Sequence, residues 1–226
     1  MRIIRNHERG RSRTSWLNSR HTFSFADYYN PKNNGVSALR VINDDLVEPS
    51  AGFDTHSHNN VEIITYVLEG MIEHKDSLGN ITQLNAGDFQ VMTTGTGVTH
   101  SEYNPSKKEG LHFLQIWIWP DTRGLTPAYD QKAFPVNTQR QTIASPNGPL
   151  HINQDATLER LYLKAGNNES LNINTGRCGA LFVVSGELEI PTTSLSAGDT
   201  LILNETSDIL LKGSKNTEAL WFNLPL

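Results

Sequence analysis

Two pairs of potential metal ligands lie in the N-terminal half of the sequence and share the same spacing. The first pair is His56 and His58, and the second is His100 and Glu102. Side chains two residues apart on a strand point to the same face, so each pair presents two ligands together. Two such pairs on neighbouring strands of a small barrel converge on one interior point. The spacing therefore predicts a single transition-metal site with three imidazoles and one carboxylate.

Three imidazoles and one carboxylate leave part of a metal's coordination sphere open. A catalytic metal needs this opening because substrate or dioxygen must also bind. Neutral imidazole and ionised carboxylate are both available near pH 7. The same ligand set accommodates Fe, Mn, Co, Ni, Cu or Zn, and their availability decides among them. An isolated His-x-His pair is weak evidence, whereas two pairs of matched spacing make a metal site the favoured interpretation.

The residues that must position these ligands form short segments typical of β-strands. β-Branched and aromatic residues cluster in runs that are bounded by Gly, Asn, Asp and Pro. No long segment keeps the 3.6-residue period of an amphipathic helix. The clearest runs are 62–68, 111–119, 180–184 and 200–203, with a hairpin turn at 76–80. We expect an all-β protein with many short strands.

An internal repeat indicates how these strands are organised. Gly70 opens a strand-turn-strand unit that ends in an Ala-Gly-Asp turn at 86–88, and Gly186 opens a shorter unit that ends in the same turn at 197–199. A repeat of roughly half the chain indicates two similar barrels rather than a solenoid. We therefore expect a two-domain protein built from two antiparallel β-barrels of jelly-roll type.

The first domain is expected to span residues 1–132 and to hold the metal, and the second to span residues 133–226. Counted along the second copy of the repeat, the four ligand positions fall on Asn172, Asn174, Leu211 and Gly213. None of these is a usual ligand for a transition metal. The C-terminal domain is therefore expected to lack a metal site and to serve as a structural or substrate-shaping unit.

Charge and composition limit the classes of partner. The 226 residues include 19 basic and 24 acidic side chains, for a formal charge of -5, so nothing favours nucleic-acid binding by the whole chain. Arginines crowd residues 2–13, and we interpret them as solvated surface or as partners of acidic residues rather than as a basic arm. Cys178 is the single cysteine, so no disulfide can form within the chain and a reducing compartment is the natural setting.

Membrane insertion and secretion are not expected from this sequence. It contains no apolar run of about 18 residues that could span a membrane, and its first residues lack the apolar stretch of a secretory signal. We therefore expect a cytoplasmic protein. A monomer is plausible because the repeat already supplies two barrels.

The ligand pattern resembles the cupin superfamily, whose two motifs can be placed on this sequence. Their residues are, in order, Gly52, His56, His58, Glu62 and Gly70 in the first motif, and Gly87, Gly95, His100 and Asn104 in the second. The spacings depart from the usual form, because Glu62 lies one residue further from Gly70 and His100 sits two residues late. These departures place Glu62 in doubt as a ligand, and Glu102 offers a replacement.

Departures of this kind are the pattern of the pirin family, which the sequence resembles closely over roughly its first 130 residues. The matching segments are 21–29 (HTFSFADYY), 41–45 (VINDD), 52–58 (GFDTHSH), 92–95 (MTTG) and 100–102 (HSE). The C-terminal half is much less specific, although its length is similar to that of the shorter bacterial pirin-like proteins. The resemblance implies a bicupin fold with metal ligands at His56, His58, His100 and Glu102.

The resemblance also implies an activity, the oxygenation of flavonols such as quercetin, in which dioxygen opens the central ring and carbon monoxide is released. In this hypothesis a divalent metal, most often Fe(II), is the cofactor, a flavonol and O2 are the partners, and Glu102 acts as general base if it leaves the metal. Eukaryotic pirins imply an alternative, a metal-bearing, redox-sensitive regulatory protein. A cupin isomerase that acts on a small polar metabolite is a third hypothesis.

Other polar residues carry weaker expectations. Glu62 is predicted either as a partner that holds a ligand imidazole in one tautomer or as a strand-end charge. His74 is expected to be exposed at a hairpin, and His112 to be a satisfied core histidine. We assign no catalytic role to His21, and Cys178 is expected to be structural.

Overall fold

Short strands dominate the computed structural model, which describes residues 1–204 and 207–226. The one helical element in this part of the chain is the 3-10 turn η1 (Asn6–Glu8). The prediction of an all-β protein is confirmed. Among the described residues, no helix has the length and apolarity that crossing a membrane requires.

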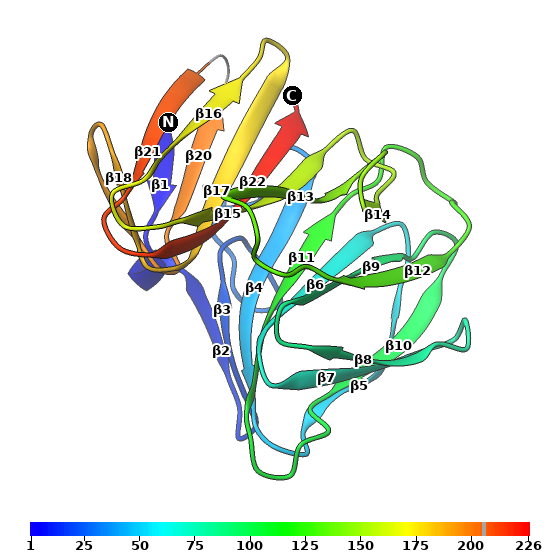
Figure 1. The fold of residues 1–226 in the computed structure, drawn as a ribbon. Helices are drawn as coiled ribbons and strands as arrows, with labels where there is room; N and C mark the ends of the chain where they lie inside the picture. Colours follow the sequence, from blue (N-terminus) through cyan, green and yellow to red (C-terminus); the bar gives the residue numbers. More distant parts are fainter. Residues whose placement is uncertain (205–206) are drawn as a thin grey trace.

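The N-terminal barrel consists of a seven-stranded and a four-stranded antiparallel sheet (Figure 1). The large sheet has the strand order β12-β9-β6-β11-β4-β3-β2, and the small sheet has the order β5-β10-β7-β8. Apolar side chains from both sheets, such as Val67 and Ile72, pack together inside the barrel. The strands are β2 (Gly10–Arg13), β3 (Leu17–His21), β4 (Leu39–Val47), β5 (Gly52–His58), β6 (Glu62–Glu69), β7 (Met71–Asp76), β8 (Ile81–Asn85), β9 (Asp88–Thr93), β10 (Val98–Tyr103), β11 (Leu111–Ile118) and β12 (Ala128–Ala133).

The C-terminal barrel repeats this design with a seven-stranded sheet, β1-β20-β17-β22-β15-β13-β14, and a four-stranded sheet, β16-β21-β18-β19. Leu163 and Leu171 are among the buried residues that pack between its two sheets. The predicted architecture of two β-barrels is confirmed. The strands are β1 (Arg2–Ile4), β13 (Arg140–Ser145), β14 (Leu150–His151), β15 (Thr157–Leu163), β16 (Asn168–Ile173), β17 (Arg177–Ser185), β18 (Glu187–Ile190), β19 (Thr193–Ser196), β20 (Thr200–Asn204), β21 (Ser207–Gly213) and β22 (Thr217–Pro225).

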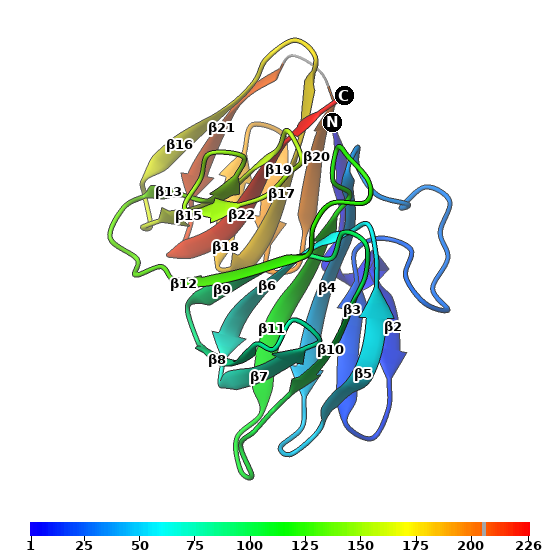
Figure 2. The same cartoon turned by 90° about the vertical axis from the view of Figure 1, so that its right-hand side faces the viewer.

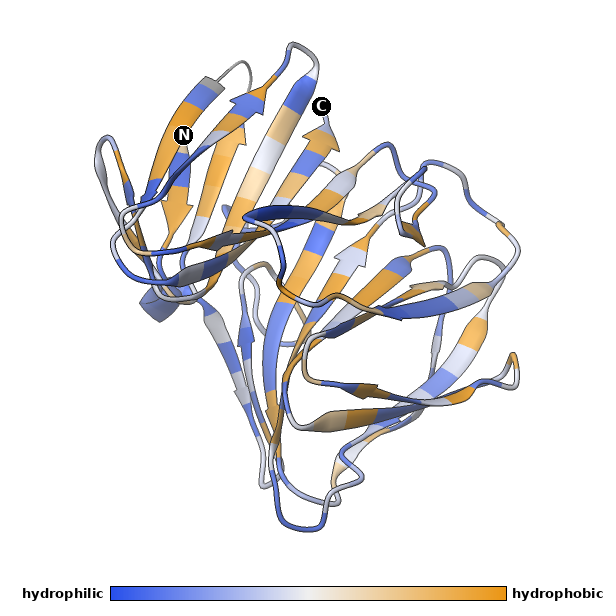
Figure 3. Ribbon diagram, in the orientation of Figure 1, coloured by the Kyte–Doolittle hydropathy of each residue, from blue (hydrophilic) through white to orange (hydrophobic). Residues whose placement is uncertain are grey.

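The large sheets of the two barrels lie next to each other (Figure 2). A shared apolar core joins them. Tyr66 and Phe89 of the first barrel belong to the same buried cluster as Phe182 and Phe222 of the second. Strand β6 is consequently buried on both faces, and residues 63–67 are all buried. This explains why its sequence is a continuous apolar run rather than an alternating one. Figure 3 shows apolar residues concentrated along the strands of the large sheets, whereas the connecting loops are mostly hydrophilic.

The first strand of the chain belongs to the second barrel. β1 pairs with β20, and the chain then passes to β2 in the first barrel. Just after β1, Arg5 forms an ion pair of 2.7 Å with Asp199, which confirms that an N-terminal arginine serves as the partner of an acidic residue. The division of the chain after residue 132 stays a proposal, and this residue lies near the junction of β12 and β13. The finding that residues 2–4 join the sheet of the C-terminal barrel amends the proposed boundaries.

Candidate metal centre

Strands β5 and β10 lie side by side in the small sheet of the N-terminal barrel and carry the four predicted ligands. His56 and His58 lie on β5, and His100 and Glu102 lie on β10. His100 is directly opposite His56 in the register. The register then shifts, so that Glu102 lies opposite Phe53. Irregularities of this kind re-aim side chains near functional sites, and here the shift moves Glu102 from the position that an even ladder would give it.

The structure brings three imidazoles together. The ring centroids are 4.7 Å apart for His56 and His58, 4.5 Å for His56 and His100, and 5.0 Å for His58 and His100. Each ring offers a nitrogen, and these nitrogens lie within 4.8 Å of one another. The Nδ1–H of His56 donates to the carbonyl oxygen of Asp54 at 2.7 Å, which leaves Nε2 free to bind a metal.

The burial of His100 gives a test of whether a metal fits this group. Its side chain is buried, yet neither ring nitrogen has a hydrogen-bond partner among the described residues. Buried polar atoms without partners are rare in folded proteins because each one loses its hydrogen bonds to water. A metal bound at one of the two nitrogens would account for that atom, so the donors present fit a transition metal.

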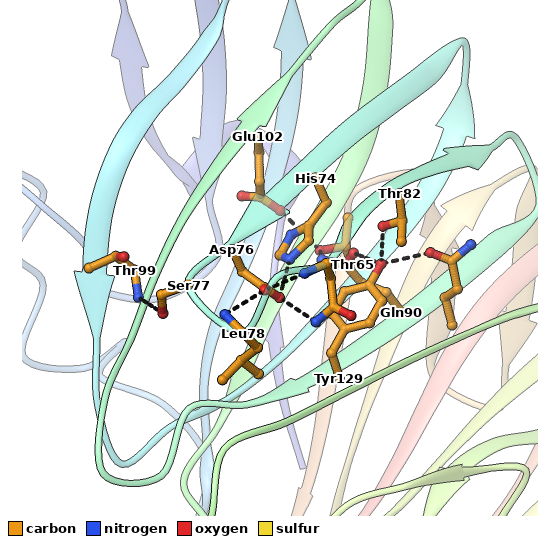
Figure 4. A network of polar contacts seen from close by, with 12 residues as sticks. Thr65, His74, Asp76, Ser77, Leu78, Thr82, Gln90, Thr99, Glu102 and Tyr129 are labelled. Atoms are coloured by element: carbon orange, nitrogen blue, oxygen red, sulfur yellow. Dashed lines mark hydrogen bonds and ion pairs between the residues drawn. The ribbon is translucent and has the colours of Figure 1, made fainter.

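Glu102 is also buried, and it lies beside His74 (Figure 4). Its carboxylate belongs to a second group rather than to the group of three imidazoles. Its Oε2 accepts a hydrogen bond from Gln115 Nε2 at 2.7 Å, and its Oε1 accepts one from Thr65 Oγ1 at 3.3 Å. The residues grouped with it are His100 and His74, with potential ligand atoms within 4.8 Å of one another. His100 thus links both groups, and the assignment of all four predicted ligands to one metal stays a prediction.

The environment keeps two of these imidazoles in the neutral form that binds metals. Burial, helped by the neighbouring His100 and His56, lowers the pKa of His58 to about 4. Burial, helped by His56 and His74, lowers the pKa of His100 to about 3. Both rings are therefore neutral at pH 7 before any metal binds, so a cation does not have to displace protons from them.

A cavity of about 340 Å³ opens beside His56 and His58. The aromatic side chains of Phe25, Phe53 and Trp117 form part of its wall. Trp117 meets Phe25 edge-on with a centroid distance of 5.4 Å, and it meets His58 at 4.9 Å. Aromatic walls with a few convergent polar groups are typical of small-molecule sites of this size.

Comparison with known proteins connects this geometry to a family. Residues 4–118 match the Pirin family model, and residues 142–224 match the model of the Quercetinase C-terminal cupin domain. The chain belongs to the pirin family. It is 45% identical over 221 residues to the quercetin 2,3-dioxygenase of Escherichia coli (strain K12), with 96% of each chain covered.

Two further comparisons place it among bacterial pirins. The chain is 38% identical over 210 residues to a pirin-like protein of Caulobacter vibrioides, with 90% of each chain covered. The solved structure of the bacterial pirin YhhW from Escherichia coli in complex with nickel(II) has a TM-score of 0.95 and 44% identity, and the match covers 99% of this chain and 98% of the other. The resemblance inferred from the motifs is therefore confirmed.

Three expectations about histidines can now be compared with the pirin fold. His74 is fully buried on β7, so its predicted exposure is wrong, although the predicted hairpin is present between β7 and β8. The contact of His112 Nε2 with Asp44 Oδ1 at 2.7 Å confirms a satisfied histidine, but its predicted place in the core is wrong because its side chain is 26% exposed. His21 lines the cavity and contacts Asn43 Oδ1 through Nδ1 at 2.7 Å, and its role in catalysis stays untested.

Two further polar residues have partners that clarify their roles in this pirin. Glu62 has no exposed surface and accepts hydrogen bonds from the backbone nitrogens of Asn153, at 2.6 Å, and Gln154, at 3.1 Å. Glu62 is the first residue of β6, which agrees with the predicted strand-end position, and it joins this strand to a loop of the C-terminal half. Cys178 is buried, and burial raises the pKa of its thiol, in agreement with a structural role.

Asp45 is a cavity residue that the sequence analysis missed. It lies on β4 and is buried, and its Oδ1 has no hydrogen-bond partner in the part of the chain that the structure describes. Burial is the main reason why the pKa of Asp45 is raised from the usual 3.8 to about 7. The hydrogen bond from Ser19 lowers this pKa, whereas the charges of Asp44 and Glu102 raise it. The alternation of inward and outward residues along β4 is the signal that could have placed it.

The raised pKa of Asp45 predicts a pH-dependent stability of the metal-free protein. The folded state binds this proton more tightly than the unfolded state, so the stabilisation is fully present below pH 4 and is lost as the pH rises through about 7. The loss amounts to roughly 4 kcal/mol. We expect Asp45→Asn to raise the melting temperature of metal-free protein clearly at pH 8 and much less at pH 5. An equal change at both pH values would show that Asp45 is ionised in the folded state throughout.

Proposed function

We propose that this member of the pirin family is a metal-dependent dioxygenase that opens the central ring of flavonols such as quercetin with O2 and releases carbon monoxide. The observation that carries the proposal is the group of three imidazoles beside an aromatic-lined cavity of about 340 Å³. The match to the quercetinase C-terminal cupin domain and the relative named quercetin 2,3-dioxygenase support the same reaction.

The proposed cofactor is one divalent metal, with Fe(II) as the first choice, held by His56, His58, His100 and Glu102. Mn, Co, Ni, Cu and Zn are alternatives because the same donors accept them. The nickel(II) complex of the Escherichia coli relative supports a site that admits more than iron. When bound, such a metal supplies a Lewis acid that lowers the pKa of a coordinated hydroxyl group and leaves open positions for substrate and O2.

The aromatic side chains of the cavity would hold the flat rings of a flavonol. Phe53 is braced by an edge-on contact with Trp16 at 5.1 Å, and Phe25 by its contact with Trp117. Such walls stack on aromatic rings and exclude water from the reacting groups. The 3-hydroxyl and 4-carbonyl oxygens of the flavonol would then point toward the imidazoles of His56 and His58, which line the same cavity.

Glu102 is also the proposed general base, a role that requires its carboxylate to leave the metal or to lie at the edge of the coordination sphere. The O–H bond of the flavonol 3-hydroxyl breaks, the proton passes to Oε1 of Glu102, and the electron pair stays on the flavonol oxygen. The short bond from Gln115 at 2.7 Å holds Oε2, whereas the longer bond from Thr65 at 3.3 Å leaves Oε1 freer to accept the proton. The electron-rich flavonolate then reacts with O2, and the central ring opens with loss of carbon monoxide.

A metal-bearing regulatory protein is the alternative proposal, and the relative from Caulobacter vibrioides is named a pirin-like protein. In that case other proteins would recognise a surface that changes with the oxidation state of the metal. Flavonol turnover would then be incidental and slow. The value of kcat/KM separates the two proposals, because enzymes typically reach at least about 10⁴ M⁻¹s⁻¹.

The test is anaerobic loading with Fe(II), Mn(II), Co(II), Ni(II) or Cu(II), followed by oxygenated quercetin while its absorbance is recorded. We expect at least one metal to give kcat/KM near or above about 10⁴ M⁻¹s⁻¹. His56→Ala should lose the activity, whereas the control His7→Ala, an exposed histidine of η1, should keep it. Metal-replete protein that leaves quercetin intact under every loading would favour the regulatory alternative.

A further inference from the structure

Three neighbouring strands of the small sheet place polar residues in matching rows. β10 lies between β5 and β7, and its His100 is opposite both His56 of β5 and Asp76 of β7. Its Glu102 is opposite His74 of β7. Side chains paired across adjacent strands project from the same face, so β7 presents a His-x-Asp pair on the side of His100 away from β5. His74 and Asp76 have the same two-residue spacing as the predicted ligand pairs, but the proposed function leaves both residues unused.

The carboxylate of Asp76 is held by several donors. Oδ1 accepts hydrogen bonds from the backbone nitrogens of Leu78, at 2.9 Å, and Asn80, at 3.1 Å, and Oδ2 accepts one from Asn80 Nδ2 at 2.9 Å. Oδ2 also lies 2.9 Å from Nε2 of His74, and neither side chain of this pair is exposed (Figure 4). A carboxylate with this many donors is ionised and can only accept, so the proton of this contact resides on Nε2 of His74.

The contact with Asp76 occupies Nε2 of His74, which leaves Nδ1 as the ring nitrogen that can accept a hydrogen bond. This Nδ1 is buried and has no hydrogen-bond partner among the described residues, and the same holds for both nitrogens of His100. The potential ligand atoms of His74, His100 and Glu102 lie within 4.8 Å of one another. Both oxygens of Glu102 already accept hydrogen bonds, from Gln115 and Thr65, so the ring N–H of His100 is the donor in this group that can satisfy Nδ1.

The ring of His74 is held in place by a second contact. It stacks on Tyr129 with a centroid distance of 4.7 Å and an interplanar angle of 26°. The hydroxyl group of Tyr129 is in turn fixed by Thr82, at 2.7 Å, and by Oε1 of Gln90, at 3.0 Å. His74 is thus a rigid acceptor rather than a side chain that adjusts to its neighbours.

We propose that His74 is a positioning residue that accepts a hydrogen bond from the ring N–H of His100 that the metal leaves free. Asp76, His74 and His100 then form a chain that fixes the tautomer and the orientation of one metal ligand. Partners of this kind orient ligand imidazoles and raise their basicity in metal sites generally. The inference rests on the proposed role of His100 as a ligand, but it requires neither a flavonol nor O2.

The first test is zinc affinity, measured by competition with a chelator for wild-type protein and variants. We expect His74→Phe, which keeps a ring of similar size without an acceptor, to bind Zn(II) about 10- to 100-fold more weakly. His74→Asn, which places an amide oxygen near the position of Nδ1, should recover part of this loss. The matched control is His112→Phe, because His112 also pairs with an aspartate but lies outside the cavity.

The second measurement is the ¹⁵N spectrum of the histidine rings in the Zn(II)-loaded protein. Wild type should show His100 with one zinc-bound nitrogen and one protonated, slowly exchanging nitrogen, and His74→Phe should lose the slow exchange. Asp76→Asn keeps the His74 ring and its packing, and it should weaken zinc binding in the same direction. Both readouts are independent of flavonol turnover, so an inactive wild-type protein would contradict only the proposed function.

Two results would overturn the proposal. The first is that folded His74→Phe, or Asp76→Asn, binds zinc with wild-type affinity and also keeps an unchanged His100 N–H signal. The second is a ¹⁵N shift that shows zinc bound to His74 itself, because His74 would then be a ligand in the group with His100 and Glu102 rather than a positioning residue.

Discussion

Replacement of His100 by alanine is expected to abolish metal retention and, with it, flavonol oxygenation. His100 is the one residue shared by the group of three imidazoles and the group that contains Glu102. Its loss therefore removes a donor from the centre of the site, whereas loss of His56 or His58 removes one from its edge. The remaining residues are left as a two-imidazole pair and a separate carboxylate, which is too few converging donors for a stable transition-metal site.

The measurement is metal content after loading and gel filtration, with His7→Ala as the control for loss of a histidine. The free energy of unfolding of the metal-free variant should lie within about 2 kcal/mol of the wild-type value. The cavity left by the ring destabilises the folded protein, whereas removal of two buried, unpartnered nitrogens stabilises it. A His100→Ala variant with full metal content and activity would show that the ligand assignment is wrong.

Replacement of Glu62 by alanine is expected to give the largest loss of stability among the polar substitutions considered. Its Oε1 accepts hydrogen bonds from the backbone nitrogen and the side chain of Asn153, at 2.6 and 2.9 Å, and its Oε2 accepts one from the backbone nitrogen of Gln154 at 3.1 Å. Alanine would remove the carboxylate acceptor of these donors, of which the backbone nitrogen of Gln154 is buried and those of Asn153 are half-buried. Each unsatisfied group costs about 1–3 kcal/mol, so we expect a loss of at least about 3 kcal/mol.

For a chain of this length, that loss corresponds to a drop in melting temperature of roughly 6–12 °C. Glu62→Gln keeps one acceptor oxygen and should fall between wild type and Glu62→Ala. The metal content of both variants, measured below their melting temperatures, should equal that of wild type. Wild-type stability combined with a large loss of metal would instead identify Glu62 as a residue that supports the ligand imidazoles.

The period of two along β-strands made most of the site predictable from the sequence. His56 and His58 share a face because the alternation of a strand is local, and the matched spacing of His100 and Glu102 required only that β10 lie beside β5. The split of the ligands into two groups was not predictable. It depends on a register shift beside Glu102, which arises from the pairing of two particular strands.

The errors and omissions have two kinds of physical cause. His74 lies on the same face of β7 as the buried Ile72, so the strand period predicts its burial. Its place near a hairpin turn suggested exposure instead. Glu62 contacts residues about 90 positions further along the chain, and β1 pairs with a strand near the opposite end of the sequence. No local pattern encodes such contacts, because they join segments that are far apart in the sequence.

The central claim is that the imidazole group and its cavity carry out flavonol oxygenation, and the release of carbon monoxide tests it most directly. Carbon monoxide would be measured against quercetin consumed, for protein loaded anaerobically with Fe(II) and for His100→Ala treated in the same way. The account predicts one molecule of carbon monoxide for each quercetin lost in the loaded wild-type protein, and none above background in the variant. Quercetin loss without carbon monoxide, or equal release from the variant, would contradict it.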